Sequence, residues 1–397
     1  MILLRPSAAA DVAALKGRRV IAAMVCVQLA AALGYYAVMA HLVTHLRDDV
    51  GLLAGTIALV LGLRVAVQYA LFLPFGWLVD RIGPGLAGSA ACVLRVAAFT
   101  LLGLADGLGG FVTGAVLLAI GGALFHPAAQ SLLAALPERV RPGGFGTYVV
   151  AGQVAAVAGP PVGLMLLSGG FVLVASVSAA AWAVSAVLFW RLRRLGGARS
   201  EGPMLVPGVA EVLRDRAFLR FAVVTAPGTL LASQVVSVVP LTVGDAGLIT
   251  VFLCTVAVAT AGVQPLAARR ATRPWVMRAG MLFFGAGYLL LAAVPVTPGV
   301  LVAAAVLNGL GNGLTTPAAF QTIVRYAPEG RIGVYNGLYA FMSGLAAFFA
   351  GLAVGRLFDA GAVPAALLGL AALGALSAVA TPGGPRCRAR ASARSAG

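Results

Sequence analysis

The segment LFHPAAQ at residues 124–130 has a counterpart in LTTPAAF at residues 314–320. The prolines of the two copies are 190 residues apart, which is close to half of the 397-residue chain. Three glycines repeat at a similar offset: Gly152, Gly159 and Gly163 return as Gly344, Gly351 and Gly355. The sustained offset predicts two parallel halves around a central cavity, an architecture suited to alternating access.

The composition predicts a polytopic membrane protein. Hydrophobic residues make up 61% of the chain and charged residues only 10%, against about 25% charged residues in an ordinary soluble domain. A membrane-spanning helix needs roughly 20 apolar residues, and the apolar runs are continuous rather than alternating, which favours helices over a barrel. The fold class is therefore all-α, with twelve transmembrane helices in two six-helix halves. The expected spans are 20–43, 51–75, 85–105, 110–133, 146–168, 170–190, 218–240, 246–267, 275–294, 299–320, 333–355 and 361–380.

The basic residues predict the orientation. The net charge is +16, but the Lys and Arg side chains form short clusters between apolar runs, a pattern that favours anionic lipid head groups over nucleic acid. With the N-terminus inside, all but four of the 28 basic residues fall in cytoplasmic segments. The exceptions are Arg47 and Arg356 in outer loops and Arg64 and Arg95 within spans. Both termini are therefore expected in the cytoplasm.

The predicted spans and the basic segments between them divide the chain into five parts. These parts are a cytoplasmic N-terminal segment (1–19), an N-terminal six-helix half (20–190), a cytoplasmic linker (191–217), a C-terminal six-helix half (218–380) and a basic cytoplasmic tail (381–397). We expect the protein to be a monomer in the inner or plasma membrane.

The sequence lacks the motifs of ATP-driven pumps, serine hydrolases and zinc proteases. Lys16 is the only Lys and is followed by Gly17-Arg18-Arg19, so no GxxxxGK[ST] phosphate loop exists. GxSxG and HExxH are absent, and the only adjacent acidic pair is Asp48-Asp49. We therefore expect no enzyme, no cofactor and no metal site, and transport would draw on an ion gradient.

A gating motif is expected at the cytoplasmic end of the second span, where residues 76–83 read GWLVDRIG. Gly76 and Gly83 permit close approach, Asp80 can cap a neighbouring helix, and Arg81 can pair with it or with lipid phosphate. An ordinary turn with a helix-end ion pair would look the same. The stretch resembles the GxLxDRxG signature of the major facilitator superfamily, which implies that Gly76, Asp80, Arg81 and Gly83 form its gate.

A second motif lies in the fifth span, where Gly159, Pro160 and Gly163 follow Gly152 in a GPPVG pattern. Gly and Pro let a helix pack tightly or bend. The pattern resembles the GPxxG motif of the drug antiporters of that superfamily. The LGYY segment at 33–36 and GALFHP at 122–127 are similar to the MdtH-like multidrug efflux group. The resemblance implies export of a drug or natural product by proton antiport.

Two arginines lie deep in the predicted spans. Arg64 and Arg95 are roughly 15–20 Å from either membrane surface at about 1.5 Å per residue. All twelve acidic residues lie at span ends or in loops, so no carboxylate is available at that depth. One interpretation pairs the arginines with carbonyl groups and with Gln28 and Gln68. The other places them in a hydrated cavity whose positive potential favours anionic substrates.

Other polar residues within the spans leave two interpretations open. His126 and Asp80 are the candidates for proton coupling, although His126 before Pro127 could equally be a packing residue at a kink. Hydrogen bonds to a small-molecule substrate, or helix–helix contacts, are expected from a further set. This set is Tyr36, Gln68, Gln234, Asn308 and Asn312.

The combined prediction is a secondary active transporter that exports its substrate. An importer or uniporter of a small metabolite on the same fold is the alternative.

Overall fold

The computed structural model describes residues 8–136, 141–193, 212–271, 273–327 and 332–381. These residues are helical apart from short connections and contain no strand. Twelve of the described helices are long and apolar enough to cross a membrane. The predicted all-α polytopic fold class is confirmed.

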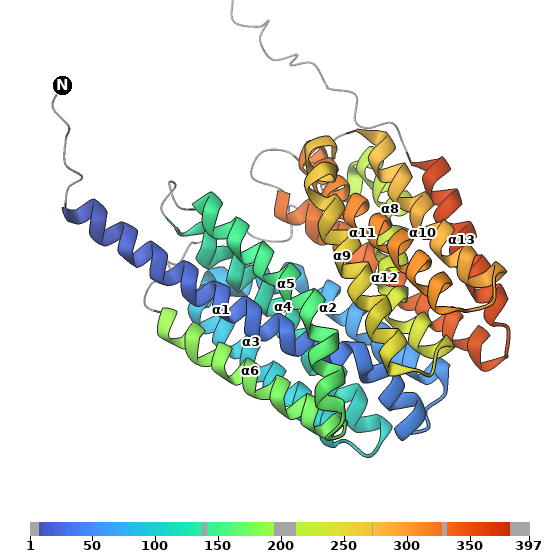
Figure 1. Ribbon diagram of the computed structural model, residues 1–397. Coiled ribbons are helices and arrows are strands. Elements are labelled where there is room, and N and C mark those ends of the chain that lie inside the picture. Colours follow the sequence, from blue (N-terminus) through green and yellow to red (C-terminus); the bar gives the residue numbers. More distant parts are fainter. Residues whose placement is uncertain (1–7, 137–140, 194–211, 272, 328–331, 382–397) are drawn as a thin grey trace, which may run out of the picture.

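The first six spanning helices form one group, coloured blue to green in Figure 1. They are α1 (Ala8–Thr44), α2 (Ala54–Ile82), α3 (Pro84–Leu104), α4 (Leu108–Ala134), α5 (Arg141–Leu167) and α6 (Phe171–Leu192). A short π-helix, η1 (His45–Asp49), continues α1.

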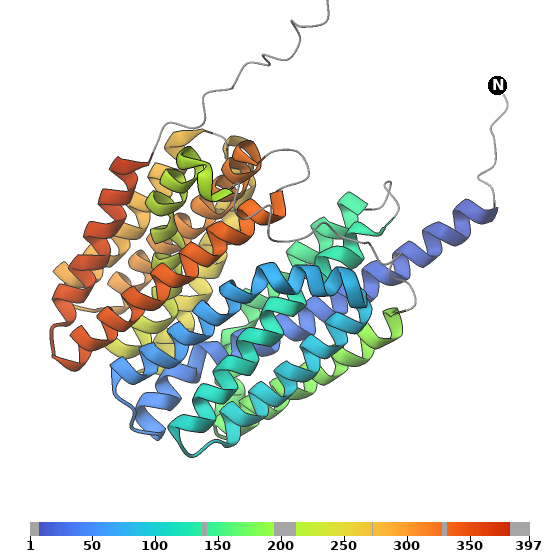
Figure 2. The ribbon, with the colours of Figure 1, turned by 180° about the vertical axis from the view of Figure 1, so that it is seen from behind.

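The remaining spanning helices form the second group, which lies beside the first in both ribbon views (Figures 1 and 2). They are α8 (Arg216–Thr242), α9 (Ala246–Arg270), α10 (Pro274–Ala293), α11 (Pro298–Tyr326), α12 (Ile332–Asp359) and α13 (Val363–Ala380). Each group has its own core: one cluster of buried side chains runs from Val20 to Leu192, and the other from Val212 to Ala378.

Several helices extend beyond the predicted spans. Helix α2 continues from the predicted end at 75 to Ile82, and α11 continues from 320 to Tyr326. Arg47 lies in η1 rather than in a loop, and Arg356 lies in the last turn of α12. Hydrophobicity reports the apolar thickness of the membrane, whereas backbone hydrogen bonding continues a helix into the polar region beyond it.

Close packing of α1 against α5 depends on the glycines of the fifth span. A Cβ at Gly163 would lie 2.5 Å from the carbonyl oxygen of Ala37, and one at Gly159 would lie 3.2 Å from that of Leu33. Gly152 faces the side-chain amide of Gln28 on the same face. The backbones of the two helices therefore approach as closely as small residues allow.

We predict that Gly163→Ala destabilises the protein by about 1–3 kcal/mol, because the added methyl must displace helix backbone rather than a flexible side chain. Gly146→Ala in the same helix is the matched control, since nothing lies within 4 Å of its Cβ position. Thermal unfolding of the purified protein in detergent, followed by tryptophan fluorescence, measures both. Equal midpoints for the two variants would contradict the packing account.

Candidate functional site

Two arginines and two aromatic rings from four helices form the most distinctive cluster in the first group. The Arg64 guanidinium on α2 lies 5.9 Å from the centre of the Tyr35 ring on α1. The Arg95 guanidinium on α3 lies 5.4 Å from the same ring and 4.6 Å from the ring of Trp182 on α6. Both cations are therefore within cation–π range of one tyrosine. We call Tyr35, Arg64, Arg95 and Trp182 the arginine cluster.

Glycines on α4 make room for the arginine cluster. A Cβ at Gly121 would lie 2.7 Å from Cγ of Arg95, and one at Gly122 would lie 2.7 Å from Oε1 of Gln68. The terminal nitrogen of Arg95 borders the same space at Gly122. The sequence thus folds with a large buried cation opposite two residues without side chains, and only 4% of Arg95 remains exposed.

Hydrogen bonding leaves the arginine cluster with more donors than acceptors. Nη1 of Arg64 donates to Oε1 of Gln68 at 3.4 Å. Nε of Arg64, Nε of Arg95 and Nε1 of Trp182 are buried without an acceptor among the described residues. Gln28, the other expected partner, lies beside Gly152. The predicted pairing with an amide therefore holds for Gln68 and not for Gln28.

Tyr36 and His126 lie near the arginine cluster and are accessible. The Tyr36 ring packs edge to face on Tyr35 with centres 5.4 Å apart, and 37% of Tyr36 is exposed. The exposed His126 ring on α4 is 6.0 Å from the ring of Phe72 on α2 and 5.7 Å from that of Phe125. His126 therefore combines exposed surface with two aromatic neighbours.

The polar residues of the second group make helix contacts instead. Asn308 is fully buried, donates to the carbonyl oxygen of Ala304 at 2.9 Å and faces Gly287 on α10. Oδ1 of Asn312 accepts a 3.3 Å hydrogen bond from Thr316 within α11. Gln234 on α8 is buried against Gly351 on α12. The structure does not bring these three amides to the arginine cluster.

The gating motif adopts a turn that requires glycine. Gly83 has a φ of +91°, which residues with a side chain rarely adopt, and it links the end of α2 to Pro84 at the start of α3. The Arg81 guanidinium lies 5.3 Å from the Trp77 ring. Gly76 has nothing within 4 Å of its Cβ position. The side chain of Asp80 lies outside the described part of the chain.

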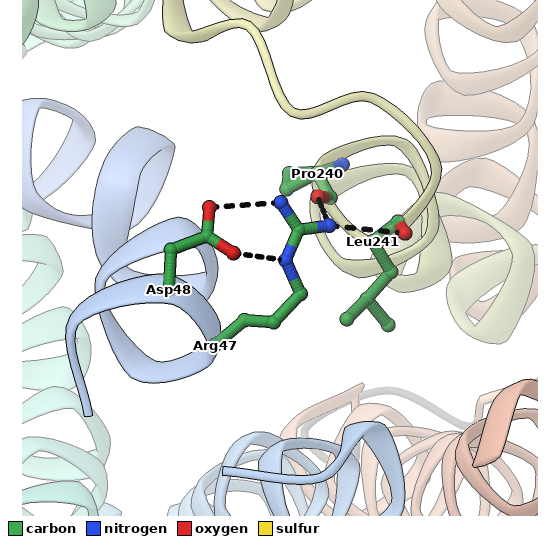
Figure 3. Close-up of polar contacts among 4 residues, drawn as sticks. All are labelled: Arg47, Asp48, Pro240 and Leu241. Atoms are coloured by element: carbon green, nitrogen blue, oxygen red, sulfur yellow. Dashed lines mark hydrogen bonds and ion pairs between the residues drawn. The ribbon is translucent and has the colours of Figure 1, made fainter. Parts of the chain in front are cut away.

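At the opposite end of the bundle, Arg47 joins the two helix groups (Figure 3). Its Nη1 donates to the carbonyl oxygens of Pro240 and Leu241 at 2.7 and 3.1 Å, at the C-terminal end of α8. Its Nε and Nη2 bind the carboxylate of Asp48 at 2.6 and 2.9 Å. A cation on the last carbonyls of a helix also opposes the negative end of its dipole. Arg47 therefore caps a helix of the other group.

A second cap in the reverse direction lies at the same end. Oδ2 of Asp359, at the C-terminus of α12, accepts a 2.8 Å hydrogen bond from the backbone amide of Gly55 in the first turn of α2. A carboxylate at a helix N-terminus satisfies a free amide and complements the dipole. We refer to the contacts of Arg47 and Asp359 as the two trans-caps.

A further contact between the groups lies where α5 packs against α9, at a carbonyl group that a proline leaves without its helical donor. Pro161 has no amide hydrogen to donate to the carbonyl of Val157, four residues earlier. The thiol of Cys254 on α9 donates to that oxygen at 3.3 Å. The Gln153 amide donates to Gln264 at 3.1 Å between the same two helices.

The end that carries the α1 N-terminus is different. The two groups diverge toward this end in both ribbon views (Figures 1 and 2). The described contacts thus hold the groups together from mid-length to the end with the trans-caps.

Twelve apolar helices in two groups of six that are joined at one end form an architecture typical of membrane transporters. The sequence profile of the Major Facilitator Superfamily matches residues 24–248 and 217–387. The chain belongs to this superfamily and is a multi-pass membrane transporter rather than an enzyme.

Relatives of known sequence agree with this assignment. The chain is 26% identical over 350 residues to an uncharacterized MFS-type transporter of Mycobacterium tuberculosis, with 83% of each chain covered. It is 27% identical over 340 residues to multidrug resistance protein MdtH of Aeromonas hydrophila, covering 82% of this chain and 84% of that protein. The predicted likeness to MdtH-like members of the superfamily is confirmed.

Solved structures share the fold. A POT family transporter in complex with a thioalcohol-conjugated peptide superposes with a TM-score of 0.78 at 14% identity, covering 90% of this chain and 94% of that one. A peptide transporter POT in complex with sulfate gives a TM-score of 0.78 at 16% identity, covering 91% and 93%. At these identities the likeness concerns the fold alone.

We predict that Arg95→Met leaves the unfolding temperature unchanged or raises it. An intramembrane charge costs at least about 2.5–3.5 kcal/mol, whereas a desolvated cation–π contact returns about 2 kcal/mol. Methionine fills much of the same space without the charge. A fall of several degrees in thermal unfolding would show instead that the charge stabilises the fold.

Proposed function

We propose that this transporter exports a drug or natural product from the cytoplasm across the cell membrane, by alternating access coupled to protons. The observation that carries the proposal is the asymmetry of the bundle: the trans-caps of Arg47 and Asp359 join the groups at one end only.

The positive-inside rule assigns the joined end to the outside. Arg81, Arg191 and Arg270 lie at the ends of α2, α6 and α9 that share a side with the α1 N-terminus. Placing that side in the cytoplasm satisfies the rule. The structure then represents a state that receives its substrate from the cytoplasm, which is where an exporter loads.

Trans-caps suit a contact that must open and close. Both lie at helix ends, where water can replace the partner of each freed carbonyl or amide group. Arg47 keeps its bidentate ion pair with Asp48 when it leaves α8. Separation of the two groups at this end therefore leaves no charge without a partner. Closure at the opposite end would then engage the gating motif of residues 76–83.

Proton coupling is assigned to His126 and Asp80. His126 is exposed on α4, about 12 Å along the helix axis from the α4 C-terminus at a rise of about 1.5 Å per residue. An imidazole is the side chain whose ordinary titration range includes physiological pH. The drug as substrate is suggested by the MdtH relatives, whose names describe multidrug resistance.

We predict that everted membrane vesicles containing the protein accumulate a lipophilic fluorescent drug against its gradient when their interior is acidified. An uncoupler should abolish the accumulation, and Asp80→Asn should reduce its initial rate by about tenfold or more, because the substitution removes the carboxylate assigned to gating and proton coupling. Arg220→Gln, an exposed substitution outside the gating motif, is the control.

Accumulation in right-side-out vesicles, with none in everted ones, would contradict export and establish uptake. Accumulation that persists with the uncoupler would contradict proton coupling.

A further inference from the structure

We propose that the arginine cluster is an anion-binding subsite that receives the carboxylate of an aromatic amphiphilic substrate. The inference rests on the proposed export function and names the class of compound that the transporter carries.

The arginine cluster carries two positive charges that no described carboxylate balances. The described acidic side chains nearest in sequence, Asp48, Asp49 and Asp106, all lie at helix ends, and Asp215, Asp245 and Asp359 do so in the second group. Arg64 and Arg95 therefore share one aromatic ring without a carboxylate partner in the described chain. Two like charges in an apolar region raise each other's cost. A bound anion removes that cost.

The arginine cluster also contains buried hydrogen-bond donors without acceptors among the residues that the structure describes. Nε of Arg64 and Nε of Arg95 are buried without an acceptor in the described residues, as is the indole nitrogen of Trp182. Buried donors normally have partners. A guanidinium presents a planar fork that matches the two oxygens of a carboxylate. The cluster thus lacks acceptors, which are the atoms that a carboxylate supplies.

The two arginines differ in how accessible they are to a ligand. Arg95 is almost completely buried, whereas Arg64 is half-buried and contacts Tyr35, whose ring packs on that of the exposed Tyr36. We therefore assign the direct contact to Arg64, with Arg95 as a positioning residue that holds Tyr35 and adds positive potential. Because Arg64 already binds Gln68, an arriving carboxylate has an oriented guanidinium to meet.

Aromatic rings near the cluster can contact the aromatic body of the ligand. An aromatic series continues from Trp182 of the cluster through Phe125, whose ring is 5.1 Å from that of Trp182 and 5.7 Å from that of His126. The His126 ring is 6.0 Å from that of Phe72, which is 5.4 Å from the ring of Tyr69 on α2. Tyr69 also packs on Gly344 of α12, in the second helix group. A ligand held at Arg64 with an aromatic body along this series would lie against the contact between the groups that must rearrange during transport.

The test uses three probes that share one fluorophore and differ in charge: dansylglycine (anionic), dansylamide (neutral) and dansylcadaverine (cationic). Binding to the full-length purified protein in neutral detergent is followed by dansyl anisotropy. We expect wild type to bind dansylglycine at least about tenfold more tightly than either of the others, a ratio equivalent to about 1.4 kcal/mol.

The variants locate the effect. Arg64→Gln should remove the preference for dansylglycine, and Arg64→Lys should retain only part of it, because the charge remains but the planar fork is lost. Arg220→Gln, which changes net charge equally at an exposed site on α8, should bind as wild type. Thermal unfolding of each variant confirms that it is folded.

Three results would overturn the inference: equal binding of the three probes by wild type, a preference for dansylcadaverine, or wild-type binding of dansylglycine by folded Arg64→Gln. Displacement of dansylglycine by phosphatidylglycerol and not by free benzoate would assign the cluster to a lipid head group and would also overturn it. The export proposal is judged separately by vesicle accumulation. Export without anion preference removes only this inference, and anion binding without export removes only the function.

Discussion

One tyrosine ring shared by two guanidinium groups is the constraint around which the interior of the first helix group is arranged. Tyr35 lies within 6 Å of both Arg64 and Arg95, so α1, α2 and α3 are joined through a single side chain. The other features of this region follow from accommodating that charge. Gly121 and Gly122 leave space on α4 for Arg95, and Trp182 supplies a second ring from α6. An interior that stores uncompensated positive charge is costly as a scaffold and reasonable as a binding site.

A second principle organises the contact between the groups. Among the described residues, most hydrogen bonds between the groups use backbone atoms that the helices themselves leave unpaired. Arg47 binds terminal carbonyls of α8, Asp359 binds a first-turn amide of α2, and Cys254 binds the carbonyl that Pro161 leaves without its helical donor. The partners of Arg47 and Asp359 lie at helix ends, where they can be exchanged for water at the surface of the membrane at small cost. The same sequence features that end or interrupt helices therefore provide a seam that can open.

Sequence was sufficient for the fold because apolar run length and a repeat of about half the chain are global properties. Sequence also singled out Arg64, Arg95 and Gln68 as polar residues within spans, because charge and amide groups stand out against apolar neighbours, and the structure places the three close together. Tyr35 and Trp182 were missed because an aromatic residue in a span is ordinary, and only the helix rotation shows that Tyr35 rather than Tyr36 faces both arginines. The approximate 192-residue repeat could not show that Asn308 packs within its own half. Arg47 was placed in a loop, and its contact with α8 spans 193 residues, beyond any local pattern.

Double electron–electron resonance in lipid nanodiscs tests the central claim, that the two groups alternate between closure at opposite ends. In a background with Cys26, Cys92, Cys254 and Cys387 replaced by Ser, one spin-label pair occupies Leu53 and Ala360 at the end with the trans-caps. The other pair occupies Trp77 and Asn336 at the opposite end; all four positions are exposed. The account predicts a short distance for the first pair and a long one for the second, and Arg47→Gln should lengthen the first while shortening the second. Distances that do not respond to the substitution, or that change in the same direction, would contradict alternation about this seam.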